Sequence, residues 1–170
     1  SANTISNAQL TAAAVTVEAS QTLTLDDVAV SNSSFADSGT IRVEAGHSLT
    51  LGGTNAISGG AITNLGTVDV AAAGTTSITS DAFTNTGAAL TVEGTLKLNA
   101  VTITGGTISD TGLIDVTGSS TIRGSTASAN TTTNAQLTAP TVTAQASPTL
   151  TLDYSADSNS TFAVSAPITV

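Results

Sequence analysis

Apolar and polar residues alternate in short segments along the whole chain. An apolar–polar–apolar triplet, such as Ile41-Arg42-Val43, occurs seven times. Alternation over a few residues, rich in Val, Ile, Leu and Thr, predicts short β-strands with one buried face. No segment has the sustained apolar period of about 3.6 residues that marks an amphipathic helix, so the pattern predicts an all-β protein. The triplets occupy residues 15–17, 41–43, 68–70, 90–92, 114–116, 142–144 and 168–170.

The spacing of the triplets predicts how the strands are arranged. Successive triplets lie about 25 residues apart, a length typical of one rung of a parallel β-helix. We therefore expect rungs of about 25 residues, stacked about 4.8 Å apart, with the apolar triplet residues facing inward. This register places Arg42 beside Asp69 on the next rung and points Ile114 into the core. The main alternative, a pair of immunoglobulin-like sandwiches, predicts strand signals every 8–12 residues instead.

A longer repeat is also present. Residues 1–43 align without a gap with residues 128–170, at an offset of 127, with 28 identities in 43 positions. The segment NAQLTA, for example, occurs at 7–12 and again at 134–139. We expect residues 1–127 to form one complete unit of about five rungs. The second copy then begins at residue 128 and continues the same solenoid to residue 170.

Four triplets are preceded by a corner signature, in which Asp or Asn stands two residues before Gly. We expect the glycines to adopt positive φ, which costs Gly no steric energy, and the Asp or Asn side chains to form Asx turns. If these corners stack one rung apart, the four side chains form a ladder along the axis; otherwise they are ordinary unstacked turns. The pairs are Asp37 and Gly39, Asn64 and Gly66, Asn85 and Gly87, and Asp110 and Gly112.

Composition narrows the classes of function. The chain contains 34 Thr and 21 Ser in 170 residues, but 12 acidic and 3 basic residues, a net charge of −9 and four aromatic residues. A surface with so few basic and aromatic side chains does not suit nucleic acid, so we expect no nucleic-acid partner. With one His, no Cys and no Met, we predict no catalytic, metal-binding or cofactor-binding residues. No uninterrupted apolar run reaches bilayer length, so we expect no membrane insertion.

Two groups of titratable residues are candidates for a site. The densest acidic pair, Asp26-Asp27, becomes Asp153-Tyr154 in the second copy. This substitution would remove half of a Ca²⁺ site, so a turn role is favoured. His47 is the only histidine, and it lies in a small-residue corner whose counterparts carry Gln or Pro. An exposed corner residue explains this exchange better than a catalytic base.

Two further arrangements suggest a ligand. Asp69 and Asp115 occupy the same triplet position two rungs apart in the expected register, which suggests the carboxylate pair of a glycoside-cleaving β-helix. The chain lacks the basic and aromatic groups that would hold a sugar there, so solvated charges are favoured. Outward threonines beside the leucine pairs suggest an ice-binding array, but Lys97 and Arg123 interrupt it, and Thr is common on exposed strands.

The segments SGTIRVEAGHSLTLGG (38–53) and NLGTVDVAAAGTTSI (64–78) resemble the β-strand repeats of large secreted bacterial proteins. These proteins include filamentous-haemagglutinin-like adhesins and autotransporter passenger domains. The resemblance covers essentially the whole chain and rests on pattern and composition rather than a diagnostic motif. It implies a right-handed parallel β-helix, export to the bacterial cell surface and a role in adhesion or biofilm matrix. It implies no catalytic residues.

The sequence therefore predicts a parallel β-helix that is a non-enzymatic stalk or fibre segment of an extracellular repeat protein. Adhesion, biofilm matrix and surface-layer assembly are the expected roles. The expected partners are further copies of the chain, end to end, and a host-surface or polysaccharide ligand. The alternative is a carbohydrate-binding or carbohydrate-processing β-helix, such as a tailspike or lyase-like fragment.

Overall fold

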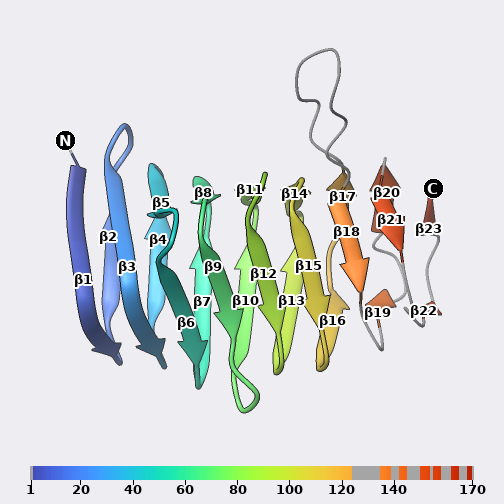
Figure 1. The fold of residues 1–170 in the computed structure, drawn as a ribbon, viewed down its shortest axis with the longest axis horizontal. Helices are drawn as coiled ribbons and strands as arrows, with labels where there is room; N and C mark the ends of the chain where they lie inside the picture. Colours follow the sequence, from blue (N-terminus) through green and yellow to red (C-terminus); the bar gives the residue numbers. More distant parts are fainter. Residues whose placement is uncertain are drawn as a thin grey trace.

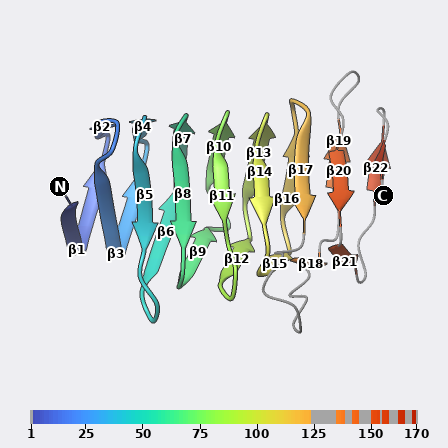
Figure 2. The same ribbon diagram turned by 90° about the horizontal axis from the view of Figure 1, so that it is seen from above.

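The protein is a stack of short parallel β-strands arranged along one long axis. The computed structural model describes residues 2–123, apart from the side chain of Arg123, and the backbone of the strands between residues 135 and 169. Both ribbon views show the strands side by side in rows, with the N-terminus at one end and the last strands at the other (Figures 1 and 2). All strand pairs in the described part are parallel, so the fold is a parallel β-solenoid, as predicted.

The strands form three faces, which we number 1 to 3. Face 1 contains β5 (Thr40–Val43), β8 (Ala61–Asn64), β11 (Ala82–Thr84), β14 (Thr102–Thr104), β17 (Ser120–Arg123), β20 (Leu150–Asp153) and β23 (Ile168–Thr169). Face 2 contains β6 (Ser48–Gly52), β9 (Thr67–Val70), β12 (Ala89–Val92), β15 (Thr107–Asp110), β18 (Ala135–Thr138) and β21 (Ser155–Asp157). Face 3 contains β2 (Ala14–Val17), β4 (Ser34–Asp37), β7 (Thr54–Ser58), β10 (Thr75–Thr79), β13 (Thr95–Asn99), β16 (Leu113–Val116), β19 (Val142–Ala144) and β22 (Phe162–Val164). Two long strands, β1 (Ala2–Thr11) and β3 (Thr22–Ser31), run along faces 1 and 2 in succession.

The rungs are shorter than the triplet spacing suggested. From β1 to β17, stacked partners such as Ala61 and Ala82, or Ala89 and Thr107, are about 20 residues apart rather than about 25. The triplets consequently fall on different faces: residues 41–43 lie on face 1, residues 68–70 on face 2 and residues 114–116 on face 3. The triplets therefore do not form a single column along the axis.

The predicted contact between Arg42 and Asp69 is therefore wrong. Arg42 on face 1 is stacked beside Thr63, whereas Asp69 on face 2 is stacked beside Thr50. The Arg42 guanidinium instead bonds the carboxylate of Glu44, with Nε 2.6 Å from Oε1. This is a local pair within one rung.

Four-residue turns explain why the spacing of the triplets is longer than one rung. Residues 18–21, 44–47 and 71–74 each form a turn closed by a backbone hydrogen bond, for example from the His47 N–H to the Glu44 carbonyl oxygen at 3.2 Å. These turns therefore recur with the same period as the triplets. They lie at the corners from face 3 to 1, from face 1 to 2, and from face 2 to 3, respectively. From residue 15 to residue 70, the sequence period thus measures one full rung of three sides plus one further side. Later triplets also stack directly, as Leu90 does beside Val68 on face 2.

The core is a continuous column of inward side chains, because alternate residues of each strand point to the axis. Ile114 is fully buried, as predicted, and so are both members of the Leu49/Leu51 and Leu96/Leu98 pairs. Leu, Ile, Val and Phe make up most of this column, which is one cluster from Val17 to Ile122. Hydrophobic burial is therefore distributed along the shaft rather than concentrated at one centre.

The corner signatures behave partly as predicted. Asx turns form at three of the four corners: the N–H groups of Gly39, Gly66 and Gly112 donate to Oδ1 of Asp37, Asn64 and Asp110, at 2.8, 3.1 and 2.6 Å. Of the four signature glycines, only Gly87 has positive φ, at 74°. The other three glycines are needed because there is no space for a side chain. A Cβ on Gly66, for example, would collide with the backbone carbonyl oxygens of Glu44 and His47 in the rung below.

The ladder is limited to two rungs. Asn64 and Asn85 stack at the corner between faces 1 and 2, where Nδ2 of Asn64 donates to Oδ1 of Asn85 at 2.8 Å. Asp37 ends β4 on face 3 and Asp110 ends β15 on face 2, so these two residues lie at other corners. Of the two arrangements that the sequence left open, the ladder forms for one pair alone among these four corners, because the signatures, like the triplets, recur at different corners.

Candidate functional site

The outer surface of the shaft consists largely of small polar residues in stacked rows. On face 1, Thr63, Thr84 and Thr104 are in register on successive rungs. The threonine pairs noted in the sequence do not form one array, since residues 22 and 24 lie on face 1, residues 48 and 50 on face 2 and residues 95 and 97 on face 3. The ice-binding array, which the sequence already disfavoured, is therefore not formed by these residues.

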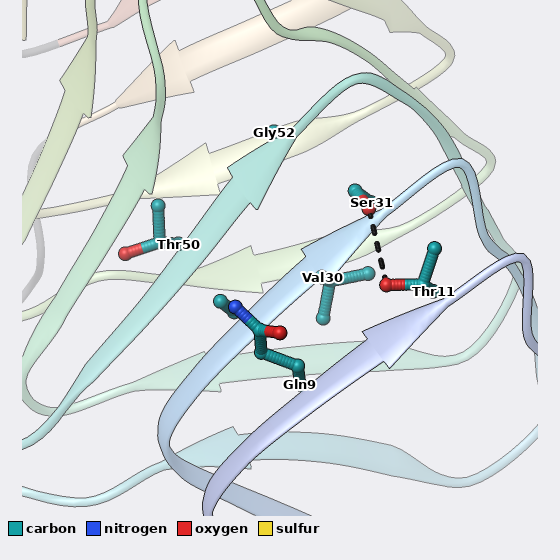
Figure 3. Close-up of a pocket in the computed structure, with 7 residues that line it drawn as sticks. Gln9, Thr11, Val30, Ser31, Thr50 and Gly52 are labelled. Carbon is teal, nitrogen blue, oxygen red and sulfur yellow. Dashed lines mark hydrogen bonds between the residues drawn. The ribbon is translucent and has the colours of Figure 1, made fainter.

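A shallow hollow of about 360 Å³ lies on face 2 near the N-terminus. Figure 3 shows Gln9 and Thr11 of β1 beside Ser31 of β3, with Thr50 and Gly52 on the next strand. The hydroxyl of Ser31 donates to that of Thr11 at 3.5 Å. Gly52 forms part of the lining. Its lining offers neutral hydrogen-bond donors and acceptors, which can bind a polar ligand. The lining contains no group that titrates near neutral pH, so it has no general acid or base.

His47 takes part in a surface network rather than in a catalytic triad. Its Nδ1 lies 2.8 Å from Oδ2 of Asp27, and both side chains are about two-fifths exposed. The backbone N–H of Ser48 donates to Oδ1 of Asp27 at 3.1 Å and its hydroxyl donates to the same oxygen at 3.4 Å. A nucleophilic serine would instead donate to the imidazole. The hydrogen bond from His47 lowers the pKa of Asp27, and the same bond raises the pKa of His47.

The Asp26-Asp27 pair has the turn role that the sequence favoured. Oδ1 of Asp26 accepts the backbone N–H of Glu44 at 3.0 Å, while Asp27 holds the other end of the same turn through Ser48. The two carboxylates of one rung therefore fix the four-residue turn of the next.

Asp69 and Asp115 do not form a carboxylate pair. Asp69 belongs to β9 on face 2 and Asp115 to β16 on face 3, so the expected placement of both on one face was wrong. Asp115 is stacked beside Lys97, whose Nζ lies 3.6 Å from Oδ2. No arrangement for glycoside cleavage results from these two residues.

Three buried aspartates were not singled out as titrating groups from the sequence. Asp37 and Asp81 lie at the corner between faces 3 and 1, on either side of the rung that carries Gly60, and each is 4% exposed. Neither oxygen of Asp81 has a well-formed hydrogen bond. Burial, with a smaller contribution from the charge of Asp37, raises the pKa of Asp81 to about 7. Burial likewise raises the pKa of Asp110 to about 6.

Because of these buried carboxylates, we expect the solenoid to be more stable in mild acid than at pH 8. The folded-state pKa of Asp81 is raised above its unfolded value, so its destabilisation is absent below about pH 4, grows as the pH rises from there to about 7, and is constant above that. We expect Asp81→Asn to raise the free energy of unfolding by about 2–4 kcal/mol at pH 8 and by little at pH 4. Urea denaturation at both pH values measures the difference.

Asp27→Asn is the matched control for this prediction. Asp27 is exposed and bonded to His47 and Ser48, so its replacement removes contacts and should not stabilise the protein at pH 8. Equal stability of Asp81→Asn and the parent chain at pH 8 would contradict the buried, charged state of Asp81.

No family model, curated protein or solved structure matches the chain. Within the described residues, no group of three or more His, Cys, Asp or Glu side chains is placed to hold a metal ion. In the same part of the chain, no helix is long and apolar enough to cross a membrane.

The first rung, at the N-terminal end of the shaft, is less buried than the rungs that follow it. The inward residues of the first rung, Ile5, Leu10 and Val15, are only partly buried against the core. A second hollow of about 210 Å³ opens here, lined by the first rung and by the start of β3. The first rung has a strand neighbour on one side only, so unpaired backbone groups and apolar side chains meet at this end.

Proposed function

We propose that the chain is a non-enzymatic structural segment, a stalk or fibre element of an extracellular repeat protein. The observation that carries this proposal is the geometry of the shaft: uniform rungs, a linear core and small polar side chains on its three faces. Such a stack acts as a spacer between the groups attached to its two ends. Its length increases with the number of rungs. Several of the described titratable residues fix turns, form surface ion pairs such as that of Lys97 with Asp115, or lie buried at corners, which supports a structural role.

The extracellular location and the adhesive role rest on sequence resemblance. The segments at 38–53 and 64–78, which resemble repeats of secreted adhesins and autotransporter passengers, form rungs of the solenoid. A surface rich in Ser and Thr and poor in Lys suits an exported fibre in a bacterial matrix or surface layer. End-to-end pairing of copies would extend the fibre, since exposed strand edges pair readily with other strands.

Antibody labelling of intact cells tests the proposed location. We expect an antibody raised against residues 40–123 to label intact cells of the producing organism, and external protease to remove the label. A cytoplasmic control protein must stay unlabelled in the same cells. Signal that appears only after permeabilisation would overturn the proposal.

A carbohydrate-binding module is the second candidate, favoured by the hollow beside Gln9. Its amide and its neighbouring hydroxyls can exchange hydrogen bonds with sugar hydroxyls, although the hollow has no aromatic residue to stack on a sugar ring. A glycan array tests this candidate. Binding that is lost in Gln9→Ala, but kept in the face 3 control Ser77→Ala, would support the module over the stalk.

A further inference from the structure

Two buried carboxylates lie on either side of a diglycine at the corner between faces 3 and 1. Asp37 ends β4, and Asp81 lies directly before β11, two rungs further along the axis. The rung between them turns this corner at Gly59 and Gly60, whose φ angles are 79° and 73°. In the register of β8 with β11, Asp81 stands directly beside Gly60. The two aspartates are therefore separated by the backbone of one glycine corner.

Oxygen atoms of Asp37 surround the position that a side chain of residue 60 would take. A Cβ on Gly60 would lie 2.7 Å from Oδ2 of Asp37 and 3.0 Å from its backbone carbonyl oxygen. A carbon atom is too crowded at these distances, but a calcium ion binds oxygen at about 2.3–2.6 Å. Gly60 itself is exposed, so this position lies close to solvent. The glycine thus keeps a place where an ion can meet two oxygens of one residue.

Three carboxylate oxygens at this corner lack a well-formed hydrogen bond: Oδ2 of Asp37 and both side-chain oxygens of Asp81. Each residue is 4% exposed, so bulk solvent does not solvate these atoms. Oδ1 of Asp37 accepts the N–H of Gly39 at 2.8 Å, which fixes the carboxylate with Oδ2 turned towards residue 60. Because buried polar atoms are almost always satisfied, the three unpartnered oxygens point to a ligand.

The charges at this corner require a positively charged ligand. Burial and, to a smaller extent, the charge of Asp37 raise the pKa of Asp81 to about 7, so the two carboxylates are close enough to repel each other. The described Arg and Lys side chains pair with other carboxylates, away from this corner. Buried charges are stable when they are paired or when they coordinate a metal. A cation between the carboxylates would satisfy their oxygens and remove the repulsion.

We propose that Asp37 and Asp81 bind one calcium ion beside Gly60. Oδ2 and the backbone carbonyl oxygen of Asp37 are two of the ligands, the carboxylate of Asp81 contributes the others from the chain, and water completes the coordination. Calcium accepts carboxylate, carbonyl and water oxygens in a flexible arrangement, whereas magnesium requires near-octahedral geometry and loses its water reluctantly. A site made from two buried carboxylates at one corner therefore favours calcium.

The bound ion links β4 to the start of β11 across the rung of β7 and β8, and so fastens three successive rungs at one corner. Spacing along the sequence did not indicate this site, because residues 37 and 81 come together only when the rungs stack. The equivalent of Asp37 in the second copy is Val164, so we expect one ion per chain. The inference goes beyond the proposed stalk and does not depend on where the chain is located.

Thermal denaturation of four chains at pH 8 tests the site. The chains are the parent, Asp37→Asn, Asp81→Asn and the matched control Asp110→Asn. Asp110 is also 4% exposed and also has an unpartnered Oδ2, but it lies on face 2, away from the diglycine. Each chain is melted with a chelator, with millimolar calcium chloride and with millimolar magnesium chloride. Calorimetric titration of calcium into the parent chain counts the ions bound.

In the parent chain and in Asp110→Asn, we expect calcium to raise the Tm by about 5 °C or more above its value in the chelator. Magnesium should raise it by clearly less. Asp37→Asn and Asp81→Asn should lose most of the calcium response, and the titration should count one ion per parent chain. In the chelator, Asp81→Asn should be more stable than the parent, so that its lost response does not come from a failure to fold.

Three results would overturn the calcium site. The first is an unchanged Tm of the parent chain in calcium. The second is an equal rise in the parent and in Asp81→Asn, which would place the ion elsewhere. The third is an equal response of the parent to magnesium and calcium, which would indicate general screening of an acidic surface. None of these results bears on the location of the chain, which cell labelling tests.

Discussion

Replacing Ile114 with Asp is expected to lower the free energy of unfolding by about 4 kcal/mol. Ile114 is 0% exposed and stacks on Leu96 within the core column. The substitution removes a large apolar side chain and places a charge where no basic residue of the described part faces it. Thermal and urea denaturation, followed by circular dichroism, measure the loss.

Ile114→Val is the matched control, because it keeps the strand propensity and removes one methylene. It should cost about 1 kcal/mol. The Asp variant should also recover part of its stability at low pH, where the introduced carboxyl is neutral. A midpoint for Ile114→Asp equal to that of the parent chain would show that residue 114 does not face the core.

Replacing Gly66 with Ala is expected to cost about 3 kcal/mol, although it adds a single methyl group. Its Cβ would collide with the carbonyl oxygens of Glu44 and His47. Both oxygens belong to the backbone of a tight turn, which has no side-chain freedom with which to yield. In urea denaturation, we expect this loss to appear as a lower transition midpoint, with a slope close to that of the parent chain.

Gly87→Ala separates this collision from backbone strain. Gly87 has φ of 74° but nothing lies within 4 Å of the Cβ it would gain. A left-handed backbone costs an Ala about 1 kcal/mol, so this variant should lose clearly less stability than Gly66→Ala. If the two variants lose the same amount, close stacking of the turns does not explain the glycine at position 66.

The sequence predicted the strands, their inward residues and the Asx turns, because these depend on local pattern. Alternation in a segment such as residues 41–43 specifies which side chains are buried in any stack. The rung length depends instead on where the chain turns corners. The turns at different corners are all rich in small residues: Glu-Ala-Ser-Gln at 18–21, Glu-Ala-Gly-His at 44–47 and Ala-Ala-Ala-Gly at 71–74. Their composition therefore does not show which corner each turn occupies.

The individual candidate residues were predicted better than their neighbours in space. The turn role of Asp26-Asp27 and the surface position of His47 follow from the substitutions between copies. The buried state of Asp81 does not, since it depends on the rung of Gly60 and on Asp37 beyond it. The partner of Arg42 was missed for a related reason. The expected rung was too long by one side of the solenoid, and this error in register moves the expected contact of Arg42 to another face.

The turns at 18–21, 44–47 and 71–74 follow a helical path around the shaft, whereas a further turn of the same kind, at 85–88, lies again at the corner between faces 1 and 2. Each of the first three turns lies one rung and one corner beyond the one before it, and the middle residues of these turns, at 19–20, 45–46 and 72–73, are exposed. Flat β-surfaces tend to stick together side by side, but a shaft with a helical ridge of exposed turns touches a parallel neighbour only at intervals. Over residues 18–74, such a ridge would hold a parallel neighbour away from the flat faces.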